Sequence, residues 1–174
     1  IDGVYAGLRP LLAGESDNTS KLSREHAVAR VAPGLVAIAG GKYTTYRVMA
    51  EDAVDAAAED IPVRVSPSIT EKVPLVGADG YFALVNQAEQ IGRQYDLHPH
   101  RVRHLLDRYG SMAVDLFAMI DEDRSLAEPL AGAEEYLRVE VVYAARHEAT
   151  LHLNDLLTRR TRISIETTDR GVEA

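Results

Sequence analysis

Residues 35 to 54, LVAIAGGKYTTYRVMAEDAV, change their hydrophobic period halfway along. The residues before Gly40 are almost continuously apolar, which is typical of a strand buried on both faces. After Thr44 the apolar residues recur at the spacing of one helical face, while the acidic residues face away. That apolar stripe consists of Tyr46, Met49, Ala50, Ala53, Val54 and Ala57. The segment therefore predicts a strand that passes through Gly40-Gly41-Lys42 directly into an amphipathic helix.

The junction between this strand and this helix is suited to receiving an electron-rich group. The first N–H groups of a helix have no intrahelical partner and carry the positive end of its dipole. Lys42 adds a cation there, and Thr44 or Thr45 can serve as the N-cap. The spacing matches neither GxxxxGK[ST] nor GxGxxG, so we do not expect nucleotide phosphate binding by those two routes. A second interpretation stays open, in which the two glycines only allow the chain to turn.

The composition is that of a soluble, globular chain with one ordinary domain or two small ones. It has 174 residues, of which 46% are apolar and 26% charged. The absence of Cys excludes disulfides and thiolate metal sites. A net charge of −8 argues against a general nucleic-acid binder, and we expect no nucleic-acid partner. The longest apolar stretches are too short to span a bilayer, so any membrane contact would be peripheral.

The organisation of the chain changes near residue 62. Residues 1–61 mix β-type runs with one helix, whereas residues 80–174 show mainly helical periodicity. The intervening segment, 62–79, contains three prolines and one glycine and is followed directly by Gly80, which is typical of a connection. We therefore predict two domains joined by a linker at 62–79.

Each part has its own expected elements. The runs 25–32 and 34–40 predict a β-hairpin with its turn at Pro33-Gly34. In the second part, Pro99 suits a first helical turn and Ser111 suits an N-cap. The helices expected there form a small bundle and cover residues 80–97, 99–110, 111–122 and 133–157.

Several segments together resemble a known family. YAGLRPLL at 5–12, SKLSREHAV at 20–28 and PGLVAIAGGKYTTYRVMAEDAVD at 33–55 resemble the carboxy-terminal portion of the FAD-dependent, aerobic-type glycerol-3-phosphate dehydrogenases. RYG at 108–110 and EVVYAARHEATLHLNDLLTRRTRI at 140–163 are similar to the helical carboxy-terminal domain of that family. The resemblance implies an α+β fragment of an FAD-binding fold, with a few strands and one helix. An all-α carboxy-terminal helical domain would follow it.

The resemblance also implies roles for individual residues. Arg9 corresponds to a substrate-binding arginine, whose planar guanidinium is suited to an oxyanion. Lys42 corresponds to a catalytic and substrate-binding lysine beside the flavin, where a cation stabilises developing negative charge. Arg24 and His26 correspond to supports of the site wall. The implied cofactor-binding residues are Gly40, Gly41, Lys42, Tyr43 and Thr44; at position 43 the family more often has Trp or Leu.

The implied activity is the oxidation of sn-glycerol 3-phosphate to dihydroxyacetone phosphate, with electrons passed through FAD to a quinone. Two alternatives stay open: a glycerophosphate oxidase that uses oxygen, and a helical domain that acts as a non-catalytic interaction or dimerisation module. We expect a location in the cytoplasm or peripherally on the inner face of the cytoplasmic membrane, and we keep a homodimer open.

The 174 residues also lack parts that the implied chemistry needs. They contain no GxGxxG motif, and the family's catalytic histidine belongs to a region before Ile1. We therefore interpret the chain as a piece of a longer protein. Taken alone, it is expected to be inactive and not to hold FAD.

We expect no metal site in the helical part. His98, His100 and His104 form a cluster, but no carboxylate at matching spacing completes it, and nearby arginines would repel a cation. Glu148, His152 and Asp155 would share one face of the helix 133–157, where ion pairs and packing are the better interpretation. The basic run Arg159, Arg160 and Arg162 is typical of a solvated or intramolecular feature.

Overall fold

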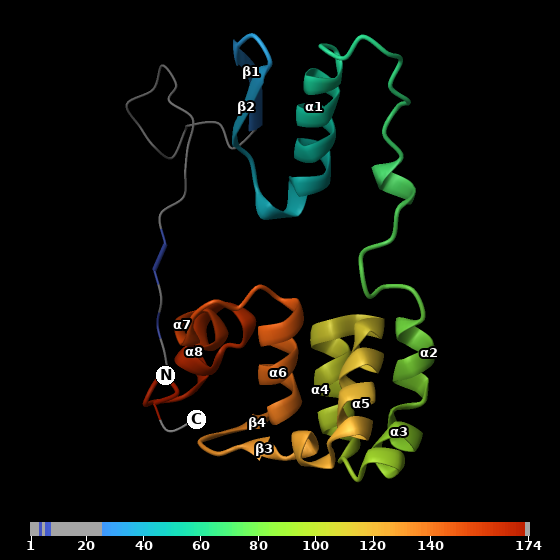
Figure 1. Cartoon of the computed structure of the whole chain (residues 1–174), viewed down its shortest axis with the longest axis vertical. Helices are drawn as coiled ribbons and strands as arrows, with labels where there is room; N and C mark the ends of the chain where they lie inside the picture. Colours follow the sequence, from blue (N-terminus) through green and yellow to red (C-terminus); the bar gives the residue numbers. More distant parts are fainter. Residues whose placement is uncertain (1–3, 5, 8–25, 173–174) are drawn as a thin grey trace. The chain divides into compact units, whose positions relative to one another are not determined.

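The computed structural model describes residue 4, residues 6–7 and residues 26–172. The chain divides into two compact units, which are considered separately below (Figure 1). The first unit is Gly7–Pro74, and the second is Leu75–Ala174 together with Ile1–Ala6. The division falls inside the segment 62–79 for which we predict a linker.

The first unit contains the predicted β-hairpin. Strand β1, His26–Ala32, pairs antiparallel with β2, Leu35–Gly40, so that His26 lies opposite Gly40 and Val28 opposite Ile38. The turn at Pro33-Gly34 places Gly34 at φ +72°, a conformation that glycine adopts without the steric cost of a Cβ. The hairpin prediction is therefore confirmed.

Helix α1, Tyr46–Ala58, packs against this hairpin. Two side chains of β1, His26 and Arg30, contact acidic residues of the helix and of the turn that follows it. His26 Nε2 of β1 lies 2.6 Å from Asp52 Oδ2. Arg30 pairs with Glu59 at 3.0 Å and with Asp60 at 2.5 Å. These pairs join the first strand to the polar face of the helix.

No residue described in the first unit is fully buried, contrary to the expectation of a strand buried on both faces. Leu35 and Ile38 of β2 remain exposed. The physical reason is that, among the described residues, β2 pairs with one strand, β1, and a single helix, α1, packs against the hairpin. Much of the predicted apolar stripe of α1, including Tyr46 and Val54, is exposed for the same reason.

The segment after α1 folds back onto the helix. Arg47 Nη2 donates to the Val73 carbonyl at 2.7 Å, and the Arg47 guanidinium also donates to the Thr70 carbonyl and hydroxyl. Thr70–Lys72 forms a single 3-10 turn. Arg47 thereby holds this segment, which contains just one short turn, against α1.

The second unit is a helical bundle with a small sheet (Figure 1). Its long helices, α3 to α6, contact one another in sequence order, and α2 also contacts α4. The bounds are α2 Tyr81–Asn86, α3 Ala88–Tyr95, α4 Pro99–Tyr109, α5 Ala113–Glu122, α6 Arg138–His147, α7 Leu153–Asp155 and α8 Ile163–Glu166. The prediction for 99–110 is confirmed, with Pro99 in the first turn of α4. The expected helix 80–97 is two helices that meet at Gln87.

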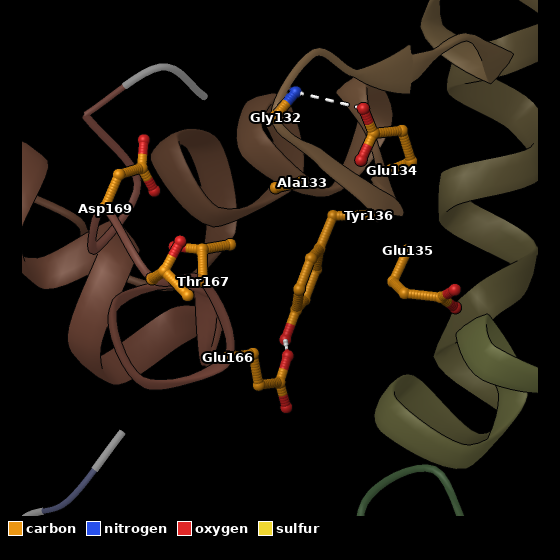
Figure 2. A pocket seen from close by; sticks show the side chains of 9 residues that line it. Gly132, Ala133, Glu134, Glu135, Tyr136, Glu166, Thr167 and Asp169 are labelled. Atoms are coloured by element: carbon orange, nitrogen blue, oxygen red, sulfur yellow. Dashed lines mark hydrogen bonds between the residues drawn. The ribbon is translucent and has the colours of Figure 1, made fainter. Parts of the chain in front are cut away.

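The prediction of an all-α second domain is wrong. Strands β3, Pro129–Leu130, and β4, Ala133–Leu137, form an antiparallel pair where the sequence pattern predicts the start of a long helix. Gly132 at φ +76° makes the turn between them. The strand conformation buries Ala133 and Tyr136 against Ile163, a contact that helical periodicity within 133–157 does not reveal. Tyr136 also donates its hydroxyl hydrogen to Glu166 Oε2 at 2.7 Å (Figure 2).

Two further boundaries differ from the predictions. Helix α6 ends at His147, and Ala149 at φ +51° breaks the helix that the sequence pattern extends to residue 157. Ser111 lies inside a 3-10 turn, Gly110–Met112, so α5 begins at Ala113 without the expected serine cap.

The core of the second unit lies between α3, α4, α5 and α6. Its central side chains, which are inaccessible to solvent, include Val102, Leu105, Leu106, Leu116, Ile120 and Val139. Burying each leucine or isoleucine stabilises the fold by about 1.5–3 kcal/mol. The helical unit therefore has a continuous apolar core, which the described residues of the first unit lack.

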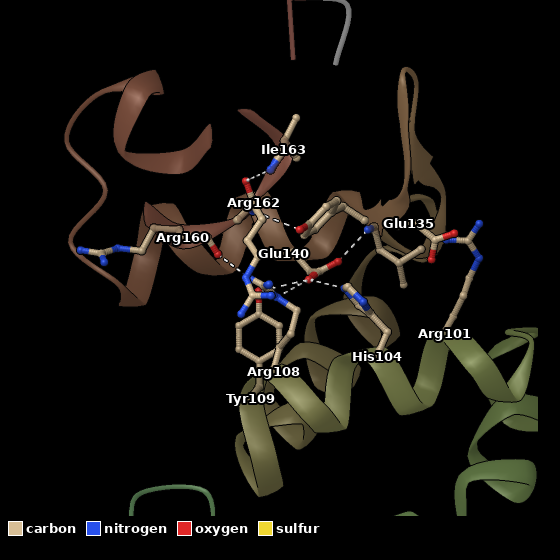
Figure 3. Close-up of polar contacts among 12 residues, drawn as sticks. Arg101, His104, Arg108, Tyr109, Glu135, Glu140, Arg160, Arg162 and Ile163 are labelled. Carbon is tan, nitrogen blue, oxygen red and sulfur yellow. Dashed lines mark hydrogen bonds and ion pairs between the residues drawn. The ribbon is translucent and has the colours of Figure 1, made fainter. Parts of the chain in front are cut away.

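One buried carboxylate connects three elements of this unit. Glu140, at the third position of α6, has no solvent exposure. Its Oε2 accepts the Leu137 N–H at 2.8 Å and so caps the start of α6. Its Oε1 lies 3.1 Å from His104 Nε2 and 3.4 Å from Arg108 Nε, both on α4, and accepts from the Tyr109 hydroxyl at 3.3 Å (Figure 3). Burial and the Glu140 charge together raise the pKa of Tyr109, so its hydroxyl remains a donor.

No helix formed by the described residues is long and apolar enough to cross a membrane.

Replacing Gly110 with alanine should destabilise the second unit by about 3 kcal/mol. Gly110 has φ +59°, and a Cβ there would lie 2.8 Å from the carbonyl carbon of Gly77 and 2.9 Å from its Cα. Thermal denaturation followed by circular dichroism measures the change. Gly80→Ala is the matched control, because Gly80 has φ +79° but only Ser111 Cβ, 4.0 Å away, near its Cβ position. Equal losses in the two variants would contradict the packing argument.

Replacing Glu140 with alanine should lower the free energy of unfolding by about 3–5 kcal/mol. Arg108 would lose its only ion-pair partner among the described residues, and the Leu137 N–H would lose its acceptor. Urea denaturation measures the loss. Glu140→Gln keeps an oxygen for the Leu137 N–H and should cost less, while Glu122→Ala on the exposed end of α5 should cost almost nothing. An unfolding midpoint of Glu140→Ala equal to that of Glu122→Ala would refute this role.

Candidate functional site

The junction predicted from the sequence has an unusual backbone. Strand β2 ends at Gly40, and Gly40 and Gly41 have φ values of +79° and +82°. Lys42 then returns to an extended conformation, and a 3-10 turn, Tyr43–Thr45, leads into α1. Two consecutive residues with positive φ explain why glycine occupies both positions.

Gly41 also has a packing role. A Cβ at this position would lie 2.7 Å from Met49 Cε and 3.3 Å from His26 Cβ. The glycine thus lets the first turn of α1 approach the end of the hairpin. The second interpretation from the sequence, in which the glycines have a structural role only, is therefore sufficient to explain Gly41.

The main chain around Lys42 is held by Thr45. The Lys42 N–H donates to Thr45 Oγ1 at 3.3 Å, and the Lys42 carbonyl accepts from the hydroxyl and the N–H of Thr45 at 3.1 and 3.0 Å. Thr45 precedes α1, as one of the two expected N-caps, but its hydroxyl bonds backward to Lys42. This closed turn fixes the direction in which the lysine leaves the backbone.

The side chains at the junction are open to solvent. The Lys42 ammonium forms no hydrogen bond or ion pair with any residue that the structure describes, and Tyr43 is 91% exposed. The Tyr43 ring lies 6.1 Å from the Tyr46 ring. Thr44 is likewise exposed. The junction thus presents a cation and an aromatic ring beside a glycine-rich backbone.

Two of the residues that we assign to this region lie outside the described residues. Arg9 and Arg24 both fall there, so the structure gives no geometry between Arg9 and Lys42. His26 is described, and its Nε2 is hydrogen-bonded to Asp52 Oδ2. That contact ties β1 to α1.

The histidines of the helical unit have structural partners. His98 precedes α4 and its Nδ1 accepts the His100 N–H at 3.1 Å. His104 faces Glu140. Within the described part of the chain, no group of three or more histidine or acidic side chains is arranged to hold a metal ion.

The predicted common face of Glu148, His152 and Asp155 does not form. Helix α6 ends before Glu148, and α7 begins after His152. Asp155 instead accepts the His152 N–H at 3.0 Å and pairs with Arg159 at 3.0 Å. The pKa of Asp155 is lowered, mainly by the hydrogen bond from the His152 N–H. The pKa of Glu148 is raised, mainly by burial.

The sequence reasoning missed two adjoining cavities in the second unit. The first, which we call the acidic cavity, has a volume of about 580 Å³, and none of the described residues that line it is Lys, Arg or His (Figure 2). The second, which we call the basic cavity, has a volume of about 540 Å³. Glu135, Tyr136 and Glu166 line both. The basic side chains that line the second are His100, Arg103, His104, Arg108 and Arg162.

The wall between the cavities is an ordered hydrogen-bonded pair. Tyr136 donates to Glu166 and accepts the Arg162 N–H at 3.0 Å. Burial, followed by the bond to Glu166, raises the pKa of Tyr136 to about 12. A signal for the basic cavity exists in the sequence, because four of its basic residues recur at i, i+3, i+4 and i+8 along 99–110.

Comparison with known proteins identifies relatives over nearly the whole chain. It is 70% identical to glycerol-3-phosphate dehydrogenase 2 of Mycobacterium bovis over 99% of its residues, which is 30% of that protein. It is 64% identical to glycerol-3-phosphate dehydrogenase of Mycobacterium leprae over 99% of its residues and 29% of that protein. It is 37% identical to the mitochondrial glycerol-3-phosphate dehydrogenase SDP6 of Arabidopsis thaliana over 98% of its residues and 29% of that protein.

The chain thus spans about 30% of the length of these relatives. Residues 68–174 match the family model described as the C-terminal domain of alpha-glycerophosphate oxidase. Because this match covers more than half of the residues, the chain belongs to the family of the C-terminal domain of alpha-glycerophosphate oxidase.

Proposed function

We propose that this chain is the carboxy-terminal part of an FAD-dependent enzyme that oxidises sn-glycerol 3-phosphate to dihydroxyacetone phosphate. The names of the relatives support the substrate, and the family match supports a place in the carboxy-terminal part. The observation that carries the proposal is the junction at Lys42, a cation that pairs with none of the described residues and lies beside two glycines with positive φ at a helix start.

The residues of the junction fit one wall of a flavin site. Gly40 has φ +79° and no side chain, so the backbone there could approach a flat ring closely, whereas the Cβ direction of Gly41 is filled by Met49. A helix start beside Lys42 favours an electron-rich ligand. Gly40, Gly41, Lys42, Tyr43 and Thr44 would hold this side of the cofactor. FAD, when bound, supplies the acceptor for the two electrons of the oxidation.

Lys42 has the chemistry of an electrostatic catalyst. Its ammonium has no carboxylate partner among the described residues, so its charge is available to a ligand. A positioned cation stabilises an oxyanion more strongly in a site from which water is excluded. In our proposal, Lys42 stabilises the negative charge that develops as the substrate hydroxyl loses its proton, and Arg9 binds the phosphate end of the substrate.

We propose a quinone as the electron acceptor, reached from a peripheral position on the membrane. Oxygen is the specific alternative, since the matched family is described as an oxidase domain whereas the relatives are named dehydrogenases. Assaying the full-length enzyme for quinone reduction and for hydrogen peroxide release distinguishes the two. Peroxide formed in proportion to substrate would replace quinone with oxygen in the proposal.

Replacing Lys42 with alanine in the full-length enzyme should slow substrate-dependent flavin reduction by about 100-fold. The measurement is stopped-flow absorbance of the flavin band after mixing with glycerol 3-phosphate. Lys42→Arg keeps the charge and should retain more activity. Lys72→Ala, in the 3-10 turn at Thr70–Lys72, is the matched control and should leave the rate unchanged. Equal rates for Lys42→Ala and Lys72→Ala would remove Lys42 from the site.

The 174-residue chain alone should not retain FAD. Its described residues offer one wall of a flavin site, and the first unit buries none of its described side chains. We expect no flavin absorbance after the chain is purified with added FAD and passed through a desalting column. A chain that stays yellow would show that the missing residues contribute less to cofactor binding than we propose.

A further inference from the structure

We propose that the basic cavity of the second unit binds a small oxyanion, a phosphate or a carboxylate group, at Arg103 and Arg162. The cavity lies beside α4, β4 and the start of α8 and belongs entirely to the helical unit. Its volume of about 540 Å³ is within the range of small-molecule sites. The proposal is independent of the reaction assigned to the Lys42 junction.

The two arginines have donors to spare. Arg162 is exposed, and its guanidinium makes no hydrogen bond or ion pair with any of the residues that the structure describes. Arg103 binds Asp107 through Nε alone, at 2.8 Å, and its two terminal nitrogens have no hydrogen-bond partner within the described ranges. A guanidinium with a free edge binds a carboxylate or phosphate through parallel N–H groups.

Hydrogen bonds fix the main chain of Arg162 and the carboxylate that Arg103 binds. Tyr136 accepts the Arg162 N–H and so fixes the main chain at the cavity wall. Arg103 is one turn along α4 from Asp107, which the Tyr81 hydroxyl also holds at 2.6 Å. That bond from Tyr81, with the charge of Arg103, lowers the pKa of Asp107 and keeps it ionised.

Two of the other basic side chains already have Glu140 as a partner. Arg108 is paired with the buried Glu140 and also donates to the Arg160 carbonyl, and its guanidinium lies 5.3 Å from the centre of the Tyr136 ring. His104 faces the same carboxylate. Arg108 and His104 therefore form the floor of the cavity. Of the three remaining basic side chains, Arg103, Arg162 and His100, the two arginines carry a permanent charge and are the groups that we assign to the ligand.

The acidic side chains around the cavity do not cancel this preference. Asp107 is occupied by Arg103 and Tyr81, and Glu166 accepts the Tyr136 hydroxyl. The Glu135 side chain is 72% exposed, and its Oε2 lies 4.0 Å from His100 Nδ1. Water screens such an exposed charge strongly. Glu135 should therefore weaken anion binding without preventing it.

The test is isothermal titration of the 174-residue chain with inorganic phosphate and, separately, with succinate in a chloride buffer. We expect saturable binding with a dissociation constant below about 10 mM for at least one of the two anions. Binding of phosphate alone identifies a phosphate group as the ligand, and binding of succinate alone identifies a carboxylate. Binding of both supports the shared oxyanion chemistry, and binding of neither overturns the proposal.

Variants with opposite expected effects make the assignment specific. Arg162→Gln should weaken binding about tenfold, because it removes a charged donor. Glu135→Gln should strengthen binding, because it removes a repelling carboxylate. Arg146→Gln changes the net charge by the same amount on the exposed face of α6 and should have no effect. If Arg162→Gln and Arg146→Gln bind the anion equally well, the proposed site is wrong.

Discussion

The helical unit depends on one carboxylate that has no contact with water. Glu140 caps α6 through the Leu137 N–H, pairs with Arg108 and contacts the His104 ring, both on α4. A buried charge of this kind costs several kcal/mol to desolvate, and only a complete set of partners offsets that cost. Because Arg108 also bonds the Arg160 carbonyl, the same carboxylate indirectly holds the segment that carries Arg162. The basic cavity thus has its floor in the core of the fold.

The first unit is built on a different physical basis. Its hairpin and helix are joined by surface charge pairs of His26 and Arg30 and by the close approach of Gly41 to Met49, and none of its described residues is fully buried. Exposed charge pairs contribute little to stability, about 0–1 kcal/mol each. An apolar strand such as β2 gains its usual stabilisation only when both faces are covered. The unit is therefore suited to contributing one wall of a larger site.

Local pattern predicted the elements whose signals are local. Pro33-Gly34 between two β-type runs, Pro99 at a helix start and the helical stripe after Thr44 each led to an element that the structure contains. The pattern failed at 133–157, where the strand Ala133–Leu137 depends on burying Tyr136 against Ile163, 27 positions later. It failed again at Gln87 and Ala149, where single residues interrupt otherwise helical runs. At the predicted junction, the glycine conformations and the position of the Lys42 cation could be anticipated, but the packing of Gly41 on Met49 could not.

The sequence by itself determined the β-hairpin, the strand–glycine–lysine–helix junction and the family resemblance, because each depends on neighbouring residues and on motif spacing. Only the tertiary structure decided that Glu140 is buried and that Tyr136 and Glu166 separate two cavities. It also decided that the Arg108 guanidinium has two partners whereas that of Arg162 has none among the described residues. These properties depend on contacts such as those of Tyr136 with Glu166 and of Arg108 with Arg160, which join residues 30 and 52 positions apart. Charge pairing across such separations leaves no periodic trace, so a sequence pattern lists the charged residues but not their partners.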